Sequence, residues 1–199
     1  MQSWILLCKY PEPGLSKTRL TKDGIDGAEF ARASIKDLIQ ILLKKKKHVT
    51  IMCFPKTRVE EFKKEFEVED NVITSTEKDL GLALADAFAQ VFDKNKFQGY
   101  TFLGMDCVDP ELFEDREDNV IYPANDGGYV RLTIQTQELL PLFENIKWSA
   151  PTTCVDQLRQ LQRLNIPTAI GKEFVDVDTK KDLLQATICT PHLKKFLKL

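Results

Sequence analysis

Three cations in the N-terminal part of the chain are spaced closely enough to bind one anion. They are Lys9, Lys17 and Arg19, and the segment between them contains Pro11, Pro13 and Gly14. The prolines restrict the backbone, and the glycine lets it approach a ligand closely. Free backbone N–H groups and charge-assisted donors suit a diphosphate, which an arginine can bind bidentately. The GxxxxGK[ST] pattern of a P-loop is absent, and a stiff connection with solvent-exposed cations is the alternative interpretation.

Aspartates occur at two places where they could bind a metal ion. Asp106 follows the apolar run at 100–103, and ligands of α/β proteins bind at the carboxyl ends of strands. Mg²⁺ and Mn²⁺ take carboxylate and phosphate oxygens, usually with one or two protein carboxylates. Asp176 and Asp178 alternate along an extended segment, so they point the same way and could complete a site that Asp106 begins. The alternative is that Asp178 or Thr179 only caps the next helix.

A third candidate is the turn Asn125-Asp126-Gly127-Gly128 between two apolar runs. The two glycines remove side chains where a sugar or a base could enter, and their amides could act as donors. Asn-Asp-Gly-Gly is also strong β-turn chemistry. Considered alone, these residues favour a plain turn between two strands.

Short apolar runs alternate with helical periods along the chain, and these elements must position the candidate residues. Strands are expected at 4–8, 49–54, 72–74, 100–103, 119–122, 129–134 and 168–170. Helices are expected at 28–43, 58–66, 80–91, after 151 and up to 186. The tail at 191–199 alternates Lys with Leu and Phe and is expected to pack against the rest. This order predicts βαβ units, hence a three-layer α/β/α fold with a mainly parallel, mixed central sheet.

Composition narrows the classes of protein. The 199 residues carry 28 basic and 30 acidic side chains, a balance that argues against a general nucleic-acid binder. The five cysteines are odd in number, widely spaced and without a CxxC pair, which argues against a disulfide framework and a zinc site. Neither a signal peptide nor an apolar stretch of about 18 residues occurs. We therefore expect a single cytoplasmic domain at 1–199 with no membrane span.

Six motifs follow one another in a recognisable order. They are KYPEPGxxKTRL, DLG followed by an amphipathic helix, LGMDC, PANDGGY, IKWSAP and DVDTKKDL. Over roughly residues 5 to 187 the chain resembles the radical-SAM/selenodomain-associated transferase 1 family. It is also similar to 2-phospholactate guanylyltransferase and molybdenum cofactor guanylyltransferase. The resemblance implies a glycosyltransferase-like protein with a nucleotide-diphospho-sugar transferase (GT-A) fold.

The resemblance also implies roles for individual residues. The nucleotide would be bound by Lys9, Pro11, Gly14, Lys17, Arg19, Gly127 and Gly128, and the metal by Asp106 and Asp178. The sequence departs from the family pattern at three places. Leu82 and Ala83 stand where Glu-Arg is common after Asp-Leu-Gly, Val108 stands where Pro follows Asp-Cys, and Asn125 replaces an Asp.

The leading hypothesis is a transferase that uses a nucleoside-diphosphate sugar, a small-molecule acceptor, and Mg²⁺ or Mn²⁺. Lys17 and Arg19 would stabilise the leaving diphosphate, and Asp126 would bind or deprotonate the acceptor hydroxyl. A nucleotidyltransferase that releases pyrophosphate from an NTP is the first alternative. The second is a nucleotide-binding module with impaired catalysis, which Leu82, Ala83 and Asn125 favour. The sequence does not predict the base, the sugar, the acceptor or the oligomeric state.

Overall fold

One seven-stranded sheet forms the centre of the molecule in the computed structural model, which describes residues 1–188 and 190–198. The strand order is β3-β2-β1-β4-β6-β5-β7. β6 pairs antiparallel with β4 and β5, whereas the other described pairings are parallel. The strands are β1 (Gln2–Lys9), β2 (His48–Phe54), β3 (Val72–Ile73), β4 (Gly99–Gly104), β5 (Val120–Pro123), β6 (Tyr129–Gln135) and β7 (Ala169–Ile170).

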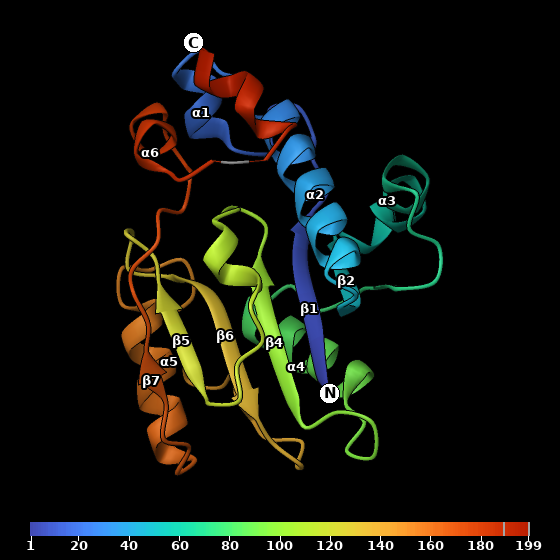
Figure 1. Ribbon diagram of the computed structural model, residues 1–199, viewed down its shortest axis with the longest axis vertical. Helices are drawn as coiled ribbons and strands as arrows, with labels where there is room; N and C mark the ends of the chain where they lie inside the picture. Colours follow the sequence, from blue (N-terminus) through green and yellow to red (C-terminus); the bar gives the residue numbers. More distant parts are fainter. Residues whose placement is uncertain (189, 199) are drawn as a thin grey trace.

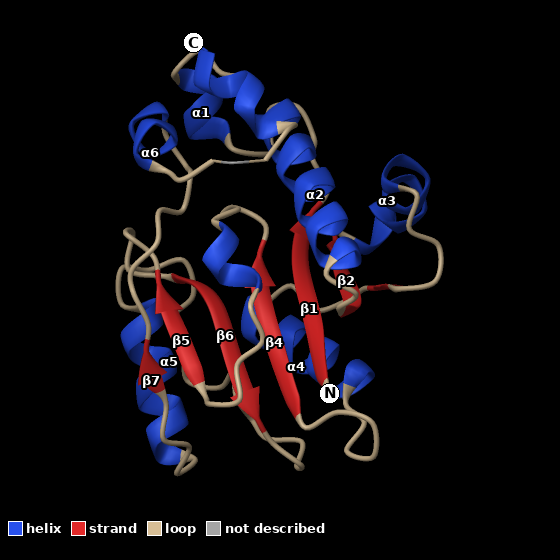
Figure 2. Ribbon diagram, in the orientation of Figure 1, coloured by secondary structure: helices blue, strands red, loops and turns tan. Residues whose placement is uncertain are grey.

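Helices cover both faces of this sheet. α2 and α3 lie on one face and α4 and α5 on the other (Figures 1 and 2), so the expected three-layer α/β/α architecture is confirmed. The α-helices are α1 (Thr18–Lys22), α2 (Gly27–Lys44), α3 (Val59–Phe66), α4 (Leu80–Val91), α5 (Thr153–Arg163) and α6 (Lys180–Gln185). The 3₁₀ helices are η1 (Lys56–Arg58), η2 (Pro110–Phe113) and η3 (Leu193–Lys198). No helix of the described residues is long and apolar enough to cross a membrane.

The alternation of side chains along β1 divides the core into two halves. Trp4 and Leu6 belong to the hydrophobic cluster that packs on α2, and Ile5 belongs to the cluster that packs on α4. Successive strand residues point to opposite faces, so a wholly apolar strand needs helices on both sides. The short helix α1, which the sequence pattern did not predict, lies outside these layers.

The carboxyl ends of β1, β4 and β5 lie at one edge of the sheet, and α1, α6 and the C-terminal segment lie beyond that edge (Figure 1). The tail packs back as expected within its described residues. Leu193 is fully buried, and Phe196 stacks edge-on against Phe30 of α2 with ring centroids 5.3 Å apart. Leu199 lies outside the described residues. Loops and short helices therefore surround the edge where ligands of such sheets bind.

Candidate functional site

The loop after β1 is held firmly by two arginines. The guanidinium of Arg32 donates to the carbonyl of Pro11 at 3.1 Å, and that of Arg58 pairs with Glu12 at 2.8 Å. Gly14 has φ +75°, a left-handed conformation that favours glycine. The predicted stiffness of this loop thus comes from long-range arginine contacts as well as from its prolines.

Lys17 ends this loop in an uncommon backbone conformation. Its φ of +47° lies in the left-handed region, which residues other than glycine rarely adopt. Its carbonyl accepts a hydrogen bond from Thr21 N of α1, and a Cβ at Gly27 of α2 would come within 2.3 Å of that oxygen. Close packing of α2 against the loop therefore fixes the backbone from which the lysine side chain extends.

The ammonium group of Lys17 lies among three carboxylates. Its Nζ is 2.9 Å from Asp106 Oδ1, 2.8 Å from Asp178 Oδ1 and 3.4 Å from Asp176 Oδ1. The lysine side chain is only 7% exposed. Burial disfavours its charge, but the three carboxylates outweigh burial and raise the pKa of Lys17 above its ordinary value. The two acidic segments that the sequence singled out therefore meet, and we call Lys17 and these aspartates the acidic cluster.

The acidic cluster has more carboxylates than cations. Burial, together with the charge of Asp106, raises the pKa of Asp176 to about 7. Asp106 Oδ1 is buried and contacts Lys17 only as an ion pair, with no hydrogen bond of good geometry from any described residue. Arg19 adds a second cation at the rim, 3.1 Å from Asp178 Oδ2, but its side chain is 68% exposed. The buried part of the cluster retains an excess of negative charge.

This excess makes the cluster chemically suitable for a hard cation. Its donors are carboxylate oxygens, which Mg²⁺ and Mn²⁺ prefer, and Asp106 Oδ1 has unused acceptor capacity. Within the described residues, no three His, Cys, Asp or Glu side chains are already arranged around a common metal position. The three aspartates surround an ammonium instead, so a divalent ion would share or take over the position of Lys17 Nζ.

The capping alternative for Asp178 is resolved by its neighbour. Thr179 caps α6, accepting a hydrogen bond from Asp182 N, and the Asp182 carboxylate accepts from Thr179 N to complete a capping box. The Asp178 side chain takes no part in the cap and instead binds the two cations. Asp178 is therefore available for ligand chemistry.

Asn125, one of the departures from the family pattern, joins the turn to the second acidic segment. Its side-chain oxygen accepts from Asp176 N at 2.9 Å, and its amide nitrogen donates to Asp182 Oδ1 at 3.2 Å. An aspartate could accept from the backbone but could not donate to a second carboxylate. In this chain the asparagine therefore positions Asp176, a role that the sequence gave no sign of.

The glycine turn uses its own amides. Gly127 N donates to Ala124 O at 3.0 Å, and Gly128 N donates to Asp126 Oδ1 at 2.8 Å. Gly127 has φ +89°, and a Cβ there would lie 2.1 Å from Pro151 O. The donors that the sequence suggested for a nucleotide are engaged within the turn, so their proposed contact with a ligand would require rearrangement. Asp126 remains exposed at the edge of a cavity.

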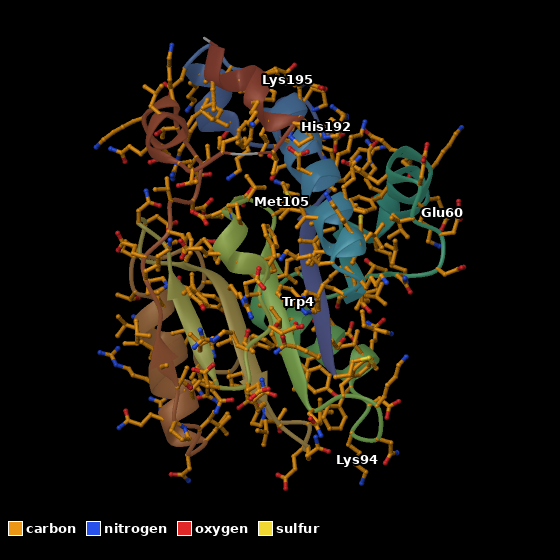
Figure 3. The ribbon with its side chains drawn as sticks, in the orientation of Figure 1. Trp4, Glu60, Lys94, Met105, His192 and Lys195 are labelled. Carbon is orange, nitrogen blue, oxygen red and sulfur yellow. The ribbon has the colours of Figure 1, made fainter. Side chains whose placement is uncertain are left out.

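Two adjoining cavities open beside the acidic cluster. The first, of about 700 Å³, is lined by the loop after β1, Asp106 and Phe54, and we call it the loop cavity. The second, of about 540 Å³, is lined by Asp126 and Trp148, and we call it the Trp148 cavity. Residues that line both are Leu7, Arg19, Leu80, Gly104, Ser149 and Asp178. Figure 3 shows Met105, another residue of the loop cavity, at the end of β4 that lies towards α1 and α6.

Most of the predicted site residues line one of the two cavities or both. Lys9, Lys17 and Asp106 line the loop cavity, Asp126 and Gly128 line the Trp148 cavity, and Arg19 and Asp178 line both. Neither lining includes Pro11, Gly14 or Gly127. Lys9 Nζ also donates to Leu15 O at 3.0 Å within its own loop. Trp148 lies in the IKWSAP motif, but the sequence predicts no role for it, because a lone aromatic residue in a loop has no spacing that predicts its partners.

One protein family and several solved structures are similar to this chain. A family model described as an uncharacterized protein conserved in bacteria (DUF2064) matches residues 38–150, more than half of the chain. No curated protein is significantly similar to the sequence. The radical-SAM/selenodomain-associated family suggested by the motifs is not among these matches.

Solved structures show the same fold. A candidate nucleotide-diphospho-sugar transferase from Desulfovibrio desulfuricans G20 superposes with a TM-score of 0.80 at 25% identity, covering 92% of this chain and 84% of that one. The inositol-1-phosphate CTP transferase of T. maritima gives 0.53 at 13% identity, covering 92% and 91%. The 4-diphosphocytidyl-2C-methyl-D-erythritol synthase of Anaerococcus prevotii DSM 20548 gives 0.59 at 10% identity, covering 100% and 96%. The chain therefore has a nucleotide-diphospho-sugar transferase fold.

Proposed function

The chain belongs to the DUF2064 family, and we propose that it transfers a sugar from a nucleoside-diphosphate donor to a small-molecule acceptor. One observation carries the proposal. The loop cavity, with three cations in its lining, and the Trp148 cavity, with three carboxylates, share Asp178 and Arg19 and lie where β1 and β4 end. A donor needs cations for its phosphates, and an acceptor hydroxyl needs a carboxylate, so the two halves suit the two substrates. The name of the D. desulfuricans neighbour supports the same class.

The donor diphosphate would lie in the loop cavity. Lys9 and Arg19 line it, and the exposed Arg19 guanidinium can turn from Asp178 to a phosphate. Asp106, Asp176 and Asp178 would hold Mg²⁺ or Mn²⁺, which supplies positive charge to the leaving diphosphate. Displaced from the aspartates, Lys17 would add a further cation to the same phosphates. These groups favour the transition state because negative charge grows on the departing phosphate.

The acceptor would lie in the Trp148 cavity beside Asp126. Its hydroxyl oxygen forms a bond to the anomeric carbon of the sugar and loses its proton to the Asp126 carboxylate. The bond between that carbon and the phosphate oxygen breaks, and its electron pair leaves with the nucleoside diphosphate. The hydrogen bond from Gly128 N to Asp126 Oδ1 orients the carboxylate before the acceptor binds.

A two-stage experiment tests this function. Thermal unfolding is first measured with nucleoside diphosphates and nucleotide-sugars, with Mn²⁺ and with EDTA, because a ligand of the folded state raises the midpoint. Nucleotide-sugars that bind are then incubated with acceptors, and the products are identified by ³¹P NMR. We expect a Mn²⁺-dependent shift and release of nucleoside diphosphate. Asp106→Asn should abolish both, and Glu117→Gln, an exposed carboxylate outside the two cavities, should leave both unchanged.

Other products would assign the chain to the alternatives. Release of pyrophosphate from an NTP would identify a nucleotidyltransferase that uses the same cations. Binding without turnover would identify a nucleotide-binding module. Absence of any nucleotide-dependent shift, with wild-type folding intact, would contradict all three hypotheses.

A further inference from the structure

The charges of the Trp148 cavity differ from those of the loop cavity. Three carboxylates line the Trp148 cavity, those of Asp126, Asp176 and Asp178, and the one cation in its lining, Arg19, is ion-paired to Asp178 at 3.1 Å. Lys17, which lines only the loop cavity, also pairs with Asp176 and Asp178, so Asp126 is the carboxylate without an ion pair to any described residue. The loop cavity has three cations, Lys9, Lys17 and Arg19, against two carboxylates, Asp106 and Asp178. Groups that can bind phosphate are therefore concentrated on the loop side.

Helix α4 adds no cation to the Trp148 cavity. Helix α4 contributes Leu80 and Leu84 to its lining, and the whole helix, LGLALADAFAQV, contains neither lysine nor arginine. Its first turn carries the uncharged Leu82 and Ala83. A phosphate or carboxylate group in this cavity would meet mostly like charge.

The lining of the Trp148 cavity also has an apolar and aromatic part. The Trp148 ring contacts those of Tyr129 and Phe143, with ring centroids 6.4 and 6.3 Å away. The N-terminus of α4 closes on the indole, since a Cβ at Gly81 would come within 2.6 Å of Trp148 Nε1. A cavity lined by both aromatic side chains and carboxylates suits a molecule with one apolar face and several hydroxyl or amine donors.

We propose that the Trp148 cavity selects an acceptor without phosphate or carboxylate groups: a neutral or amine-bearing polyol, such as a sugar, whose apolar face packs on Trp148. This inference rests on the proposed function, because it assigns the acceptor to this cavity. A metal ion on Asp176 and Asp178 would leave Asp126 as the charged carboxylate of this cavity, so the charge selection is measured first without metal and without turnover.

Tryptophan fluorescence gives that measurement. The chain has two tryptophans, and Trp4 is fully buried, so quenchers in solution reach Trp148. Quenching by caesium, iodide and neutral acrylamide is compared at constant ionic strength in EDTA. The quenching efficiency of each ion is first divided by its efficiency on free N-acetyltryptophanamide. We expect this normalised efficiency to be at least about 3-fold higher for caesium than for iodide. Trp148→Phe should remove the quenchable component and serves as the assignment control.

Charge variants then identify which carboxylates cause the difference in quenching between caesium and iodide. Asp126→Asn combined with Asp176→Asn should raise iodide quenching towards that of caesium, whereas Glu117→Gln, at an exposed residue that does not line the cavity, should not. Circular dichroism checks that each variant is folded. Equal normalised quenching by the two ions in the wild type, or no response to the double variant, would overturn the proposal.

A transfer assay separates this proposal from the function on which it rests. Glucose, glucosamine and glucose 6-phosphate are offered as acceptors with each nucleotide-sugar that binds. Transfer to glucose or glucosamine at least about 10-fold above glucose 6-phosphate supports both proposals. Preference for the phosphorylated sugar overturns the acceptor class and leaves the transferase intact. Charge-selective quenching without transfer to any acceptor retains the cavity's charge selection and counts against the transferase.

Discussion

Two buried cations of this protein, Lys17 and Arg131, are surrounded in opposite ways. Lys17 lies at the edge of the sheet among three carboxylates. Arg131 lies within the sheet, where its guanidinium carbon is 4.7 Å from the ring centroid of Trp4 and 5.5 Å from that of Tyr122. Figure 3 shows the difference in position, with Trp4 in the body of the sheet and Met105, beside the acidic cluster, at its end.

Arg131 is stabilised mainly by neutral groups. Its Nη1 donates to the carbonyls of Leu112 and Glu114, both at 2.8 Å, and its Nε donates to Thr133 Oγ1 at 3.0 Å. Burial lowers the pKa of Arg131 to about 10, whereas the carboxylates raise that of Lys17. Through these contacts with carbonyls and aromatic rings, Arg131 stabilises the packing of the segment at 112–114 against the sheet. A cation outnumbered by carboxylates leaves charge that a ligand or metal can use.

The largest expected effect is on Arg131. Arg131→Ala should destabilise the fold by about 3–5 kcal/mol, because it leaves a cavity beside Trp4 and removes the donor from two carbonyls. Urea denaturation measures the loss. Arg116→Ala, which removes an exposed arginine paired with Asp118, should cost less than about 1 kcal/mol. A loss below about 1 kcal/mol for Arg131→Ala would show that the contacts of Arg131 contribute little to the stability of the fold.

Substitution of Lys17 should make the stability of the protein depend on metal, whereas substitution of Arg131 should not. Lys17→Met leaves three carboxylates without their ammonium and should cost about 3 kcal/mol in EDTA. Mn²⁺ should restore more stability to this variant than it gives the wild type, because the ion no longer competes with the ammonium. Thermal unfolding in EDTA and in Mn²⁺ measures both, with Lys22→Met, an exposed lysine of α1, as control. Equal Mn²⁺ shifts in variant and wild type would mean that the metal binds elsewhere.

Arg19 is the exposed counterpart of these two cations. Arg19→Ala should weaken binding of a nucleoside diphosphate by about 1.5 kcal/mol, the lower end for a charged hydrogen bond, because Arg19 is exposed to solvent. Binding of the bare nucleoside should not change. Isothermal titration calorimetry with both ligands separates the two effects. Equal losses for nucleoside and diphosphate would contradict a phosphate role for this loop.

The sequence predicts features that repeat along the chain, but it does not predict contacts between distant segments. The alternation of strands and helices predicted the layers, because burial on two faces imposes a period along the chain. Asp106 was predicted as a ligand because strand ends are where ligands bind, and Asp178 because it alternates with Asp176 along an extended segment and matches a motif of the family that the chain resembles. The pairing of Lys17 with those aspartates joins segments far apart in sequence and follows no period, so it had to come from the structure. Asn125 appeared to be a lost acid for the same reason, since its partners Asp176 and Asp182 lie in another segment.

The smallest expected effect on stability is that of Asp178→Asn, which removes the charge that a metal would use without disturbing the fold. Thr179 supplies the cap of α6, and Asp106 and Asp176 still neutralise Lys17 when Asp178 is neutral. Asp178→Asn should therefore change the free energy of unfolding in EDTA by no more than about 0.5 kcal/mol. Asparagine offers a metal a neutral carbonyl in place of a charge, so the variant should need markedly more Mn²⁺ to bind the nucleotide. Thr179→Ala is the reverse control: it should lower stability by about 1 kcal/mol through the lost cap and leave the Mn²⁺ requirement unchanged. Overlapping Mn²⁺ titrations of wild type and Asp178→Asn would exclude Asp178 as a ligand and leave Asp106 and Asp176 to hold the ion.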